Sequence, residues 1–477
     1  MTAVHDISVI LAIAAFAYFA ALNGLYLVFT GIAWRDLTRH LRERSHAPDD
    51  EIFASPVTPP VSVLVPAFNE EPTIAETVRS LLSLRYPEHE VIVVNDGSKD
   101  GTLERLRESF DLVPVRKALR QLIATAPIRA AYVSRRHRNL WVIDKANGGK
   151  ADALNAGINA SRYPYICAVD ADALLEEDAL LHVAKPIVYD PERVVATGGI
   201  VRIANGCRVD HGRVLEVNLP RSRLATLQVL EYFRAFLIGR VGWSRMNALL
   251  IISGAFGLFK RSLVETVGGY RTDTVGEDIE LVVRLHRYLR ERGEPYRIEF
   301  VADPVCWTEA PEQLGALQRQ RRRWHRGLGE TLWTHRRLVA NARYGTLGFA
   351  AVPYFLCFEL LGPVIELLGV PAVLYWWLGG GLSLAFLVAF FVVAILLGIL
   401  LSVAALMLEE FSFRRHRESS EVIRLLWFAV VENVGYRQLL ALWRCLAFVD
   451  LARGRGGWGE MQRKGFRTMT EAPLPPA

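Results

Sequence analysis

The sequence predicts an α/β protein with a doubly wound, mostly parallel sheet, combined with transmembrane and interfacial α-helices. Residues 61–95 place a segment with helical apolar spacing between two apolar runs, the pattern of strand, helix and parallel strand. Residues 165–173 have the sequence YICAVDADA, typical of a buried strand that stops on two carboxylates. Residues 7–34 carry no charge and exceed the roughly 20 residues that a helix needs to cross a bilayer.

The uncharged segment 7–34 is predicted to be a permanent membrane anchor. A cleaved signal peptide is the alternative, but the apolar run is too long and no small-residue cleavage site follows it. Arginines follow the segment closely, from Arg35 to Arg44, whereas Asp6 precedes it. Because positive residues favour the cytoplasmic side, the loop after this helix is expected in the cytoplasm.

Two later apolar segments are also expected at the membrane. Residues 382–408 carry no charge and are predicted to span it. Residues 349–378 are interrupted by three prolines and carry Glu359 and Glu366. This segment is expected either to cross with its carboxylates facing a polar interior or to lie partly along the interface first. Residues 422–449 contain several charges and are predicted to form an interfacial helix.

These segments divide the chain into four parts. They are an anchor (1–34), a cytosolic α/β domain (35–345), transmembrane helices (346–408) and an interfacial helix with a basic cytoplasmic tail (409–477). The predicted location is the inner or plasma membrane, with several crossings. The net charge of +6 is explained by arginine and lysine beside membrane segments, so no nucleic-acid partner is predicted. The five scattered cysteines predict neither zinc nor disulfides.

Acidic residues follow the predicted strands of the α/β domain. Glu70 follows the strand that starts at 61, and Asp96 follows the strand that starts at 91. Asp170 and Asp172 follow the strand at 165, and on extended backbone both would leave the same side and share a divalent cation. Ligands of such sheets bind at the carboxyl ends of the strands. The alternatives are a capping turn for Asp96 and an exposed acidic turn for the other two.

Two predicted helices begin with residues that could bind a phosphate or act as a base. Gly148 and Gly149 precede Lys150 at the start of a helix, which provides backbone donors, a positive dipole end and one cation for a phosphate. A solvated lysine is the alternative. Glu277 and Asp278 begin another predicted helix, where they are candidates for a general base or for capping carboxylates. Residues 111–139 are interpreted as an insertion without an assigned role.

Residues 318–327, QRQRRRWHRG, combine three side chains that suit a sugar phosphate. Gln320, Arg323 and Trp324 lie within about a turn and a half of helix. An indole can stack on a sugar ring, while an amide and a guanidinium hold a diphosphate. Arginines beside a membrane also bind anionic lipid, and that alternative accounts for the charge without the amide and the indole.

Together these motifs resemble the family 2 inverting glycosyltransferases of the GT-A fold. The resemblance is to the membrane-embedded processive branch with cellulose, hyaluronan and poly-N-acetylglucosamine synthases. The matching motifs follow the family's order and are VPAFNEE (65–71), VNDGSKDGT (94–102), NGGKADALN (147–155), DAD (170–172), GED (276–278) and QRRRW (320–324). The segments ISGAFGLFKR and GEDIELVVRLHRYL are most similar to poly-N-acetylglucosamine synthases.

The resemblance implies a UDP-sugar donor and assigns residues to it. It places Glu70 and Asp96 on the uridine side, with Lys150 near them. It places Asp170 and Asp172 at the diphosphate and at its divalent metal, Mg²⁺ or Mn²⁺.

The resemblance also implies the reacting and acceptor groups. Asp278 is the implied general base, with Glu277 beside it. The diphosphate and the acceptor end of the glycan are implied to contact Gln320, Arg323 and Trp324.

The implied function is that of a UDP-sugar-dependent hexosyltransferase, which extends a β-linked polysaccharide of the poly-N-acetylglucosamine or cellulose kind and couples synthesis to export. The implied partners are the donor, the growing glycan, the lipid bilayer and an accessory export subunit. One alternative is a non-processive enzyme that makes a glycolipid. An alternative of another class is an inactive membrane scaffold of an envelope assembly complex.

Overall fold

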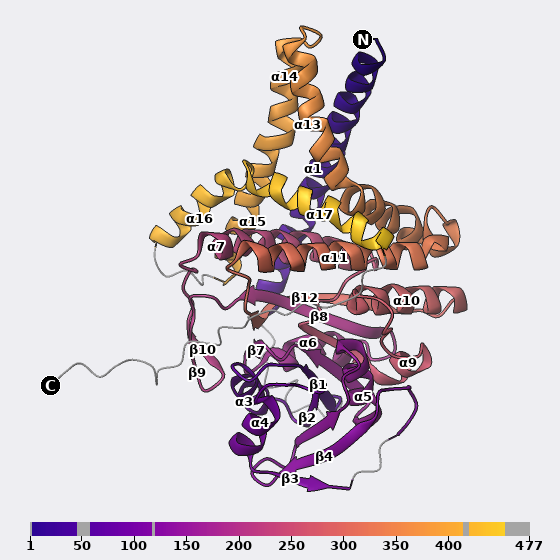
Figure 1. The fold of residues 1–477 in the computed structure, drawn as a ribbon, viewed down its shortest axis with the longest axis vertical. Coiled ribbons are helices and arrows are strands. Elements are labelled where there is room, and N and C mark those ends of the chain that lie inside the picture. Colours follow the sequence, from indigo (N-terminus) through magenta and orange to yellow (C-terminus); the bar gives the residue numbers. More distant parts are fainter. Residues whose placement is uncertain (1, 45–57, 117–119, 414–418, 454–477) are drawn as a thin grey trace, which may run out of the picture. The chain divides into compact units, whose positions relative to one another are not determined.

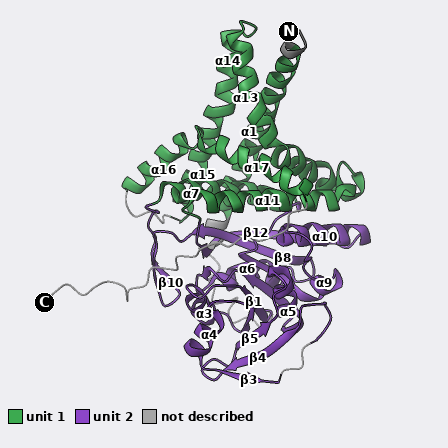
Figure 2. Ribbon diagram, in the orientation of Figure 1, with its two compact units in different colours: residues 1–41, 222–246, 311–459 green, residues 42–221, 247–310, 460–477 purple. Residues whose placement is uncertain are grey.

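The structure is a computed structural model that describes residues 2–44, 58–116, 120–413 and 419–453 (Figure 1). The chain divides into two compact units (Figure 2). Unit 1 comprises Met1–Leu41, Ser222–Met246 and Pro311–Gly459. Unit 2 comprises Arg42–Arg221, Asn247–Ala310 and Glu460–Ala477. Unit 2 contains the sheet, whereas the described elements of unit 1 are helical.

The centre of the unit 2 sheet is parallel. Its four strands are β1 (Val61–Ala67), β2 (His89–Asn95), β5 (Leu140–Lys145) and β6 (Tyr165–Val169). β1 pairs in parallel with β2 and β6, and β2 pairs in parallel with β5. Continuous apolar runs form these strands because both faces of a parallel sheet are covered. The α/β class with a parallel core, predicted from the sequence, is confirmed.

Further strands make the sheet mixed. β11 (Phe256–Lys260) lies between β6 and β8 (Val194–Ile203) and is antiparallel to both. β12 (Arg297–Thr308) runs parallel to β8, and β7 (Ala173–Leu175) is antiparallel to β12 at the edge. A separate two-stranded sheet pairs β9 (Arg208–Asp210) with β10 (Arg213–Glu216).

The segment 111–139, left without a role by the sequence, extends the sheet. β3 (Leu112–Val115) and β4 (Ile128–Ser134) are antiparallel, and β4 continues the sheet beside β5. Most residues of β4 are only half-buried, so the strand lacks the continuous apolar run of the central strands. Half-buried strands near the edge of a sheet give a weaker sequence signal than central strands, because their side chains are less completely covered.

Within the described ranges, six helices connect the strands of unit 2. They are α3 (Ile74–Leu82), α4 (Thr102–Phe110), α5 (Lys150–Ala160), α6 (Ala179–Tyr189), α9 (Arg261–Thr266) and α10 (Glu277–Arg292). α5 packs against β1 and β2 and is buried along nearly its whole length. α5 and α10 both begin at residues that the sequence singled out, Lys150 and Glu277.

Unit 1 contains helices long and apolar enough to cross a membrane. Two such helices are Asp6–Arg39 within α1 (Thr2–Arg44) and Leu384–Phe413. A third span results if Leu347–Leu360 and Gly362–Leu378, which are bent by 50° at their junction, count as one. The segments 7–34 and 382–408, predicted to span, therefore form helices of sufficient length. The bend in the third agrees with the prolines noted in the sequence.

The later candidate spans consist of consecutive shorter elements. Leu347–Leu360 consists of η4 (Leu347–Ala351), α12 (Val352–Tyr354) and η5 (Phe355–Leu360), Gly362–Leu378 is α13, and Leu384–Phe413 consists of α14 (Leu384–Phe391), η6 (Val392–Leu396) and α15 (Leu397–Phe413). The remaining described elements of unit 1 are α7 (Arg223–Phe233), η1 (Arg234–Arg240), α8 (Val241–Arg245), α11 (Leu314–Thr334), η2 (Arg336–Leu338), η3 (Ala342–Tyr344), α16 (Ser419–Val431) and α17 (Tyr436–Arg453).

Residues 422–449, expected to form one interfacial helix, belong to the two helices α16 and α17. The break lies at Gly435, which has a φ of +86°, a conformation that ends a helix readily. Glu432, at the end of α16, is buried and pairs with Arg234 and Ser402. The basic tail predicted after 453 lies outside the described residues.

Candidate active site

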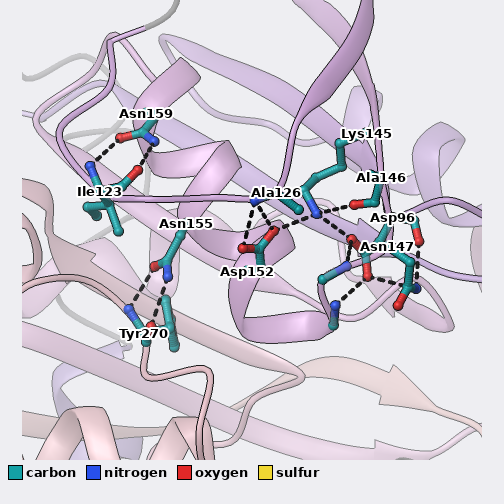
Figure 3. Close-up of polar contacts among 12 residues, drawn as sticks. Asp96, Ile123, Ala126, Lys145, Ala146, Asn147, Asp152, Asn155, Asn159 and Tyr270 are labelled. Carbon is teal, nitrogen blue, oxygen red and sulfur yellow. Dashed lines mark hydrogen bonds and ion pairs between the residues drawn. The ribbon is translucent and has the colours of Figure 1, made fainter.

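A buried lysine organises the start of α5. Lys145, at the end of β5, has no solvent exposure. Its Nζ lies 2.5 Å from Oδ1 of Asp96 and 2.5 Å from Oδ1 of Asp152. Asp152 also accepts a hydrogen bond from the amide of Ala126, at 3.0 Å (Figure 3). We call Lys145, Asp96 and Asp152 the Lys145 cluster. The lysine cation is shared by two carboxylates inside the protein, and amide donors supply further hydrogen bonds to both.

Asp96 also holds the glycine-rich loop before α5. Its carboxylate accepts hydrogen bonds from the amides of Gly148 at 3.0 Å and Gly149 at 2.7 Å. Asn147 donates its side-chain amide to both the carbonyl and the carboxylate of Asp96. Gly97 has a φ of +67°, and a Cβ there would lie 2.8 Å from the Asn147 nitrogen. The backbone of Asn147 therefore approaches Gly97 closely. A uridine contact of Asp96 stays a prediction.

A second lysine joins three segments of unit 2. Lys150 Nζ lies 2.6 Å from Oδ1 of Asp170 and 3.6 Å from Oε1 of Glu277. Asp278 accepts hydrogen bonds from the amides of Gly254 and Ile279. We call Lys150, Asp170, Glu277 and Asp278 the Lys150 cluster.

Gly254 leaves room where the charges of the Lys150 cluster meet. A Cβ at this position would lie 3.1 Å from Lys150 Nζ and 3.2 Å from Asp278 Oδ2. Burial by itself lowers the pKa of Lys150, but the charges of Asp170 and Glu277 outweigh it, so the pKa lies above its ordinary value. Lys150 is therefore a cation at neutral pH. The start of α5, the end of β6 and the start of α10 thus converge.

The two aspartates after β6 lie in a turn and not on extended backbone. The Ala173 amide donates to the Asp170 carbonyl at 3.0 Å, which closes the turn. The expectation that period-2 geometry directs both side chains to the same side is wrong, because the strand ends at Val169. The Asp170 side chain is 28% exposed, whereas Asp172 is 4% exposed. Within the described ranges, no three His, Cys, Asp or Glu residues form a group that could hold a metal by themselves.

Glu70 lies between the end of β1 and the start of α3, as predicted. Its Oε2 accepts a hydrogen bond from the Thr73 hydroxyl at 2.9 Å. Its own amide donates to the Thr102 hydroxyl oxygen at 2.9 Å. Glu70 thus connects the first turns of α3 and α4. Its predicted contact with a nucleotide is not tested by these bonds.

The third predicted group lies in unit 1, on α11. Trp324 is 41% exposed, and the guanidinium of Arg321 lies 4.5 Å from its ring centroid. Oε1 of Gln320 is buried and makes no hydrogen bond within the described part of the chain. Helical spacing places Gln320, Arg323 and Trp324 on one side of α11, next to its buried face. We predicted that these three residues share one site with the clusters of unit 2, and this stays a prediction.

Sequence reasoning missed Lys145 and gave no role to Asn155. A signal for Lys145 was present, since a lysine at the end of the apolar strand LWVIDK adjoins the glycine-rich loop. A charge placed there needs a buried partner, and Asp96 ends the neighbouring strand β2. Asn155 belongs to the motif NGGKADALN, but its partner Tyr270 lies 115 residues further along the chain.

Comparison with known protein families identifies the class of this protein. A family model described as "Glycosyltransferase like family 2" matches residues 59–327. This range is more than half of the chain and includes the two lysine clusters and the QRRRW motif. The chain belongs to this glycosyltransferase family.

Two curated synthases are similar to part of this chain. A poly-beta-1,6-N-acetyl-D-glucosamine synthase of Staphylococcus epidermidis is 32% identical over 274 residues, 57% of this chain and 55% of the relative. The synthase of the same name from Staphylococcus aureus (strain COL) is 31% identical over 315 residues, 65% of this chain and 62% of the relative. The chain thus spans less than two thirds of the length of these curated relatives.

A solved structure supports the fold. A mannosyltransferase from Pyrobaculum calidifontis, in complex with GDP-Man and Mn²⁺, has a TM-score of 0.53 and 22% sequence identity. The similarity covers 89% of this chain and 99% of that chain. The predicted α/β fold of the GT-A type is confirmed.

Proposed function

We propose that this protein is a membrane-bound inverting glycosyltransferase that moves a sugar from a UDP-sugar to a growing β-linked polysaccharide of the poly-N-acetylglucosamine or cellulose kind. The observation that carries the proposal is the convergence of Asp170, Glu277 and Asp278 around Lys150. A part-exposed cluster of this kind, next to the carboxyl ends of parallel strands, is where such sheets bind ligands. The synthases that match the chain support the choice of product.

The donor diphosphate would bind at the start of α5. Lys150 supplies a cation, and the amino end of α5 adds the positive end of the helix dipole. On the uridine side, we assign Glu70 and Asp96 to the donor. Asp96 would act through the loop amides that it holds, since its carboxylate is 2% exposed.

Asp170 and Asp172 suit a divalent metal that is bound together with the donor. Carboxylate oxygens are ligands that Mg²⁺ and Mn²⁺ prefer, and Mg²⁺ is usually held by one or two carboxylates plus phosphate oxygens. The described part of the chain holds no group of three or more His, Cys, Asp or Glu residues that could bind a metal alone, which fits a metal that the donor helps to bind. When bound, the metal supplies stabilisation of the negative charge that develops on the departing diphosphate. Mn²⁺ accompanies GDP-Man in the mannosyltransferase with the similar fold.

Asp278 is the proposed general base. It takes the proton of the acceptor hydroxyl as the hydroxyl oxygen attacks the anomeric carbon and the bond to UDP breaks. Attack from the face opposite the leaving group inverts the configuration and gives a β linkage. Lys150 pairs with Asp170 and Glu277 before the donor arrives. The negative charge of the bound diphosphate then competes with these carboxylates for Lys150.

The acceptor and the membrane are assigned to unit 1. Gln320, Arg323 and Trp324 would hold the diphosphate and the acceptor end of the glycan, with the exposed indole stacking on a sugar ring. The candidate spans support a multi-pass protein of the inner or plasma membrane. The basic residues after the first span support a cytoplasmic catalytic domain. An accessory export subunit is the further proposed partner.

A donor screen tests the proposal. The detergent-solubilised protein is supplied with single UDP-sugars and Mg²⁺ or Mn²⁺, and released UDP and product length are measured together. We expect UDP release with one donor and a long polymer. A single-sugar glycolipid would identify the non-processive alternative. A folded protein that releases no UDP from any donor would favour the inactive scaffold and contradict the enzyme assignment.

A further inference from the structure

Two buried asparagines of α5 make the same pair of hydrogen bonds to different loops. Asn155 donates its amide to the Tyr270 carbonyl at 2.8 Å and accepts from the Tyr270 amide at 2.7 Å. Asn159 donates to the Ile123 carbonyl at 2.7 Å and accepts from the Ile123 amide at 3.1 Å. Figure 3 shows the two pairs along one side of the helix. Both side chains are nearly inaccessible, 2% and 4% exposed.

The loop that Asn155 holds leads into α10. Gly269 has a φ of +74°, and a Cβ there would lie 2.4 Å from Asn155 Oδ1, so no other residue fits. From the other side, Arg284 of α10 donates to the carbonyls of Val267 and Gly269. The loop is therefore tied to α5 through Asn155 and to α10 through Arg284.

These ties connect the two helices whose first residues form the Lys150 cluster. α5 begins at Lys150, and α10 begins at Glu277 and Asp278. The ring of Tyr270 is also buried, and burial, followed by the charges of Glu277 and Asp278, raises the pKa of its phenol. The residue that Asn155 holds is thus within electrostatic reach of both carboxylates.

We propose that Asn155 is a positioning residue for the transfer reaction, because its amide, through the Tyr270 backbone, sets the position of Glu277 and Asp278 relative to Lys150. The inference rests on the proposed function. Misplacement of reacting groups by about 1 Å can lower a rate by roughly 100-fold. Asparagine suits the task since one short side chain both donates and accepts, whereas aspartate only accepts when ionised.

Asn159 provides the matched control. It has the same residue type, the same helix, the same two bonds and nearly the same burial, but it holds Ile123 in the segment before β4. Truncating either side chain leaves a buried amide and a buried carbonyl without their partners. The two alanine variants should therefore lose thermal stability to a similar extent. Asn155→Ala should disturb the geometry of the Lys150 cluster more than Asn159→Ala, because Asn155 holds the backbone of Tyr270, whereas Asn159 holds Ile123, whose side-chain Cδ1 would lie 2.7 Å from a Cβ at Gly269.

The test compares Asn155→Ala with Asn159→Ala in UDP release from the donor identified by the screen. For Asn155→Ala we expect kcat to fall by about 10- to 100-fold, while KM for the donor changes much less. For Asn159→Ala we expect kcat within about twofold of the parent. Equal losses of kcat in the two variants would overturn the proposal. If an alanine variant fails to fold, Asn155→Asp and Asn159→Asp, which keep the shape and remove the donor, decide it by the same criterion.

Asp278→Asn in the same assay separates this inference from the proposed function. If Asp278→Asn turns over normally, the base assignment is wrong, and with it the reason for positioning that carboxylate. If Asp278→Asn is inactive and the two asparagine variants behave alike, the proposed function stands and the positioning role is wrong.

Discussion

The Lys145 cluster and the Lys150 cluster have similar chemistry and different surroundings. Each combines one lysine with at least two carboxylates, and the lysines are five positions apart in the chain. The Lys145 side chain is inaccessible, and Asp96 at 2.5 Å makes three further hydrogen bonds through its carboxylate. The Lys150 side chain is 15% exposed and that of Asp170 is 28% exposed.

This difference in exposure indicates that the Lys145 cluster is structural, whereas the charges of the Lys150 cluster can exchange partners. Removing charges from water costs several kcal/mol for each ion, so a wholly buried cluster persists only with its internal partners in place. A part-exposed lysine and carboxylate exchange partners with water and with ligands at a much lower cost. The Lys150 cluster can therefore bind a charged donor, while the Lys145 cluster holds the loop from which Lys150 begins α5.

The largest effect is expected for a variant of the Lys150 cluster, the cluster to which we assign catalysis. Asp278→Asn should lower the rate of sugar transfer by about 10²- to 10⁴-fold, the usual contribution of a general base. Binding of UDP, measured by titration calorimetry, should change little, because the amide keeps the size of the side chain. Asp273→Asn is the control, since Asp273 is exposed and pairs with Arg271 in the loop before α10. Near-normal turnover of Asp278→Asn would show that another group is the base.

The variant Lys145→Met tests whether the Lys145 cluster stabilises the fold. This change leaves Asp96 and Asp152 buried without their cation, which should cost about 3–5 kcal/mol of stability. Thermal unfolding of the detergent-solubilised protein measures the loss. Lys150→Met is the matched control and should lose less, since its nearer partner Asp170 remains accessible to water and the buried Glu277 lies further away, at 3.6 Å. Equal destabilisation of the two variants would mean that burial does not separate the clusters.

Lys150→Met should instead weaken donor binding. Loss of one charge-assisted contact to a diphosphate is expected to cost about 1.5–3 kcal/mol of binding free energy. Calorimetric titration of UDP with Mg²⁺ or Mn²⁺ provides the measurement. Lys185→Met, a change on α6 outside both clusters, is the control for altered net charge. An unchanged affinity in Lys150→Met would remove this lysine from the proposed donor site.

His286 extends the comparison to a buried group whose ring contacts a hydroxyl and a carbonyl. Its ring nitrogens lie 2.6 Å from the Tyr296 hydroxyl and 3.0 Å from the Leu249 carbonyl. Burial lowers the pKa of His286 to about 3. The unfolded chain therefore binds this proton more readily than the folded protein does. The associated stability is present above the ordinary pKa of about 6.5 and is lost as the pH falls towards the folded value.

From pH 7.5 to pH 5, this group should lower the free energy of unfolding by about 2 kcal/mol. Other groups titrate in the same range, so the measurement is the difference between the parent and His286→Gln in denaturant titrations at the two pH values. The variant should show a smaller decrease. An identical decrease in both proteins would contradict the depressed pKa.

Parts of the fold followed from local sequence and others did not. The apolar runs at β1, β2 and β6 predicted the parallel core, because strands covered on both faces need continuous apolar sequence. β4, a largely half-buried strand between the edge strand β3 and β5, was missed. The positions of Asp170 and Asp172 after β6 were predicted, but the turn that separates their exposures was not, because it depends on where β6 stops pairing.

Apolar periodicity and charge are local properties, so they identified from the chain alone the segments that could span a membrane, the central strands and the carboxylates that follow them. The partner of each charge depends on how distant segments fold together. Asp96 meets Lys145 across 49 positions because β2 and β5 pair in parallel. Lys150 meets Asp170 and Glu277 where the start of α5 approaches the end of β6 and the start of α10. Burial then made one lysine structural and left the other accessible to a ligand, a distinction that residue type does not contain.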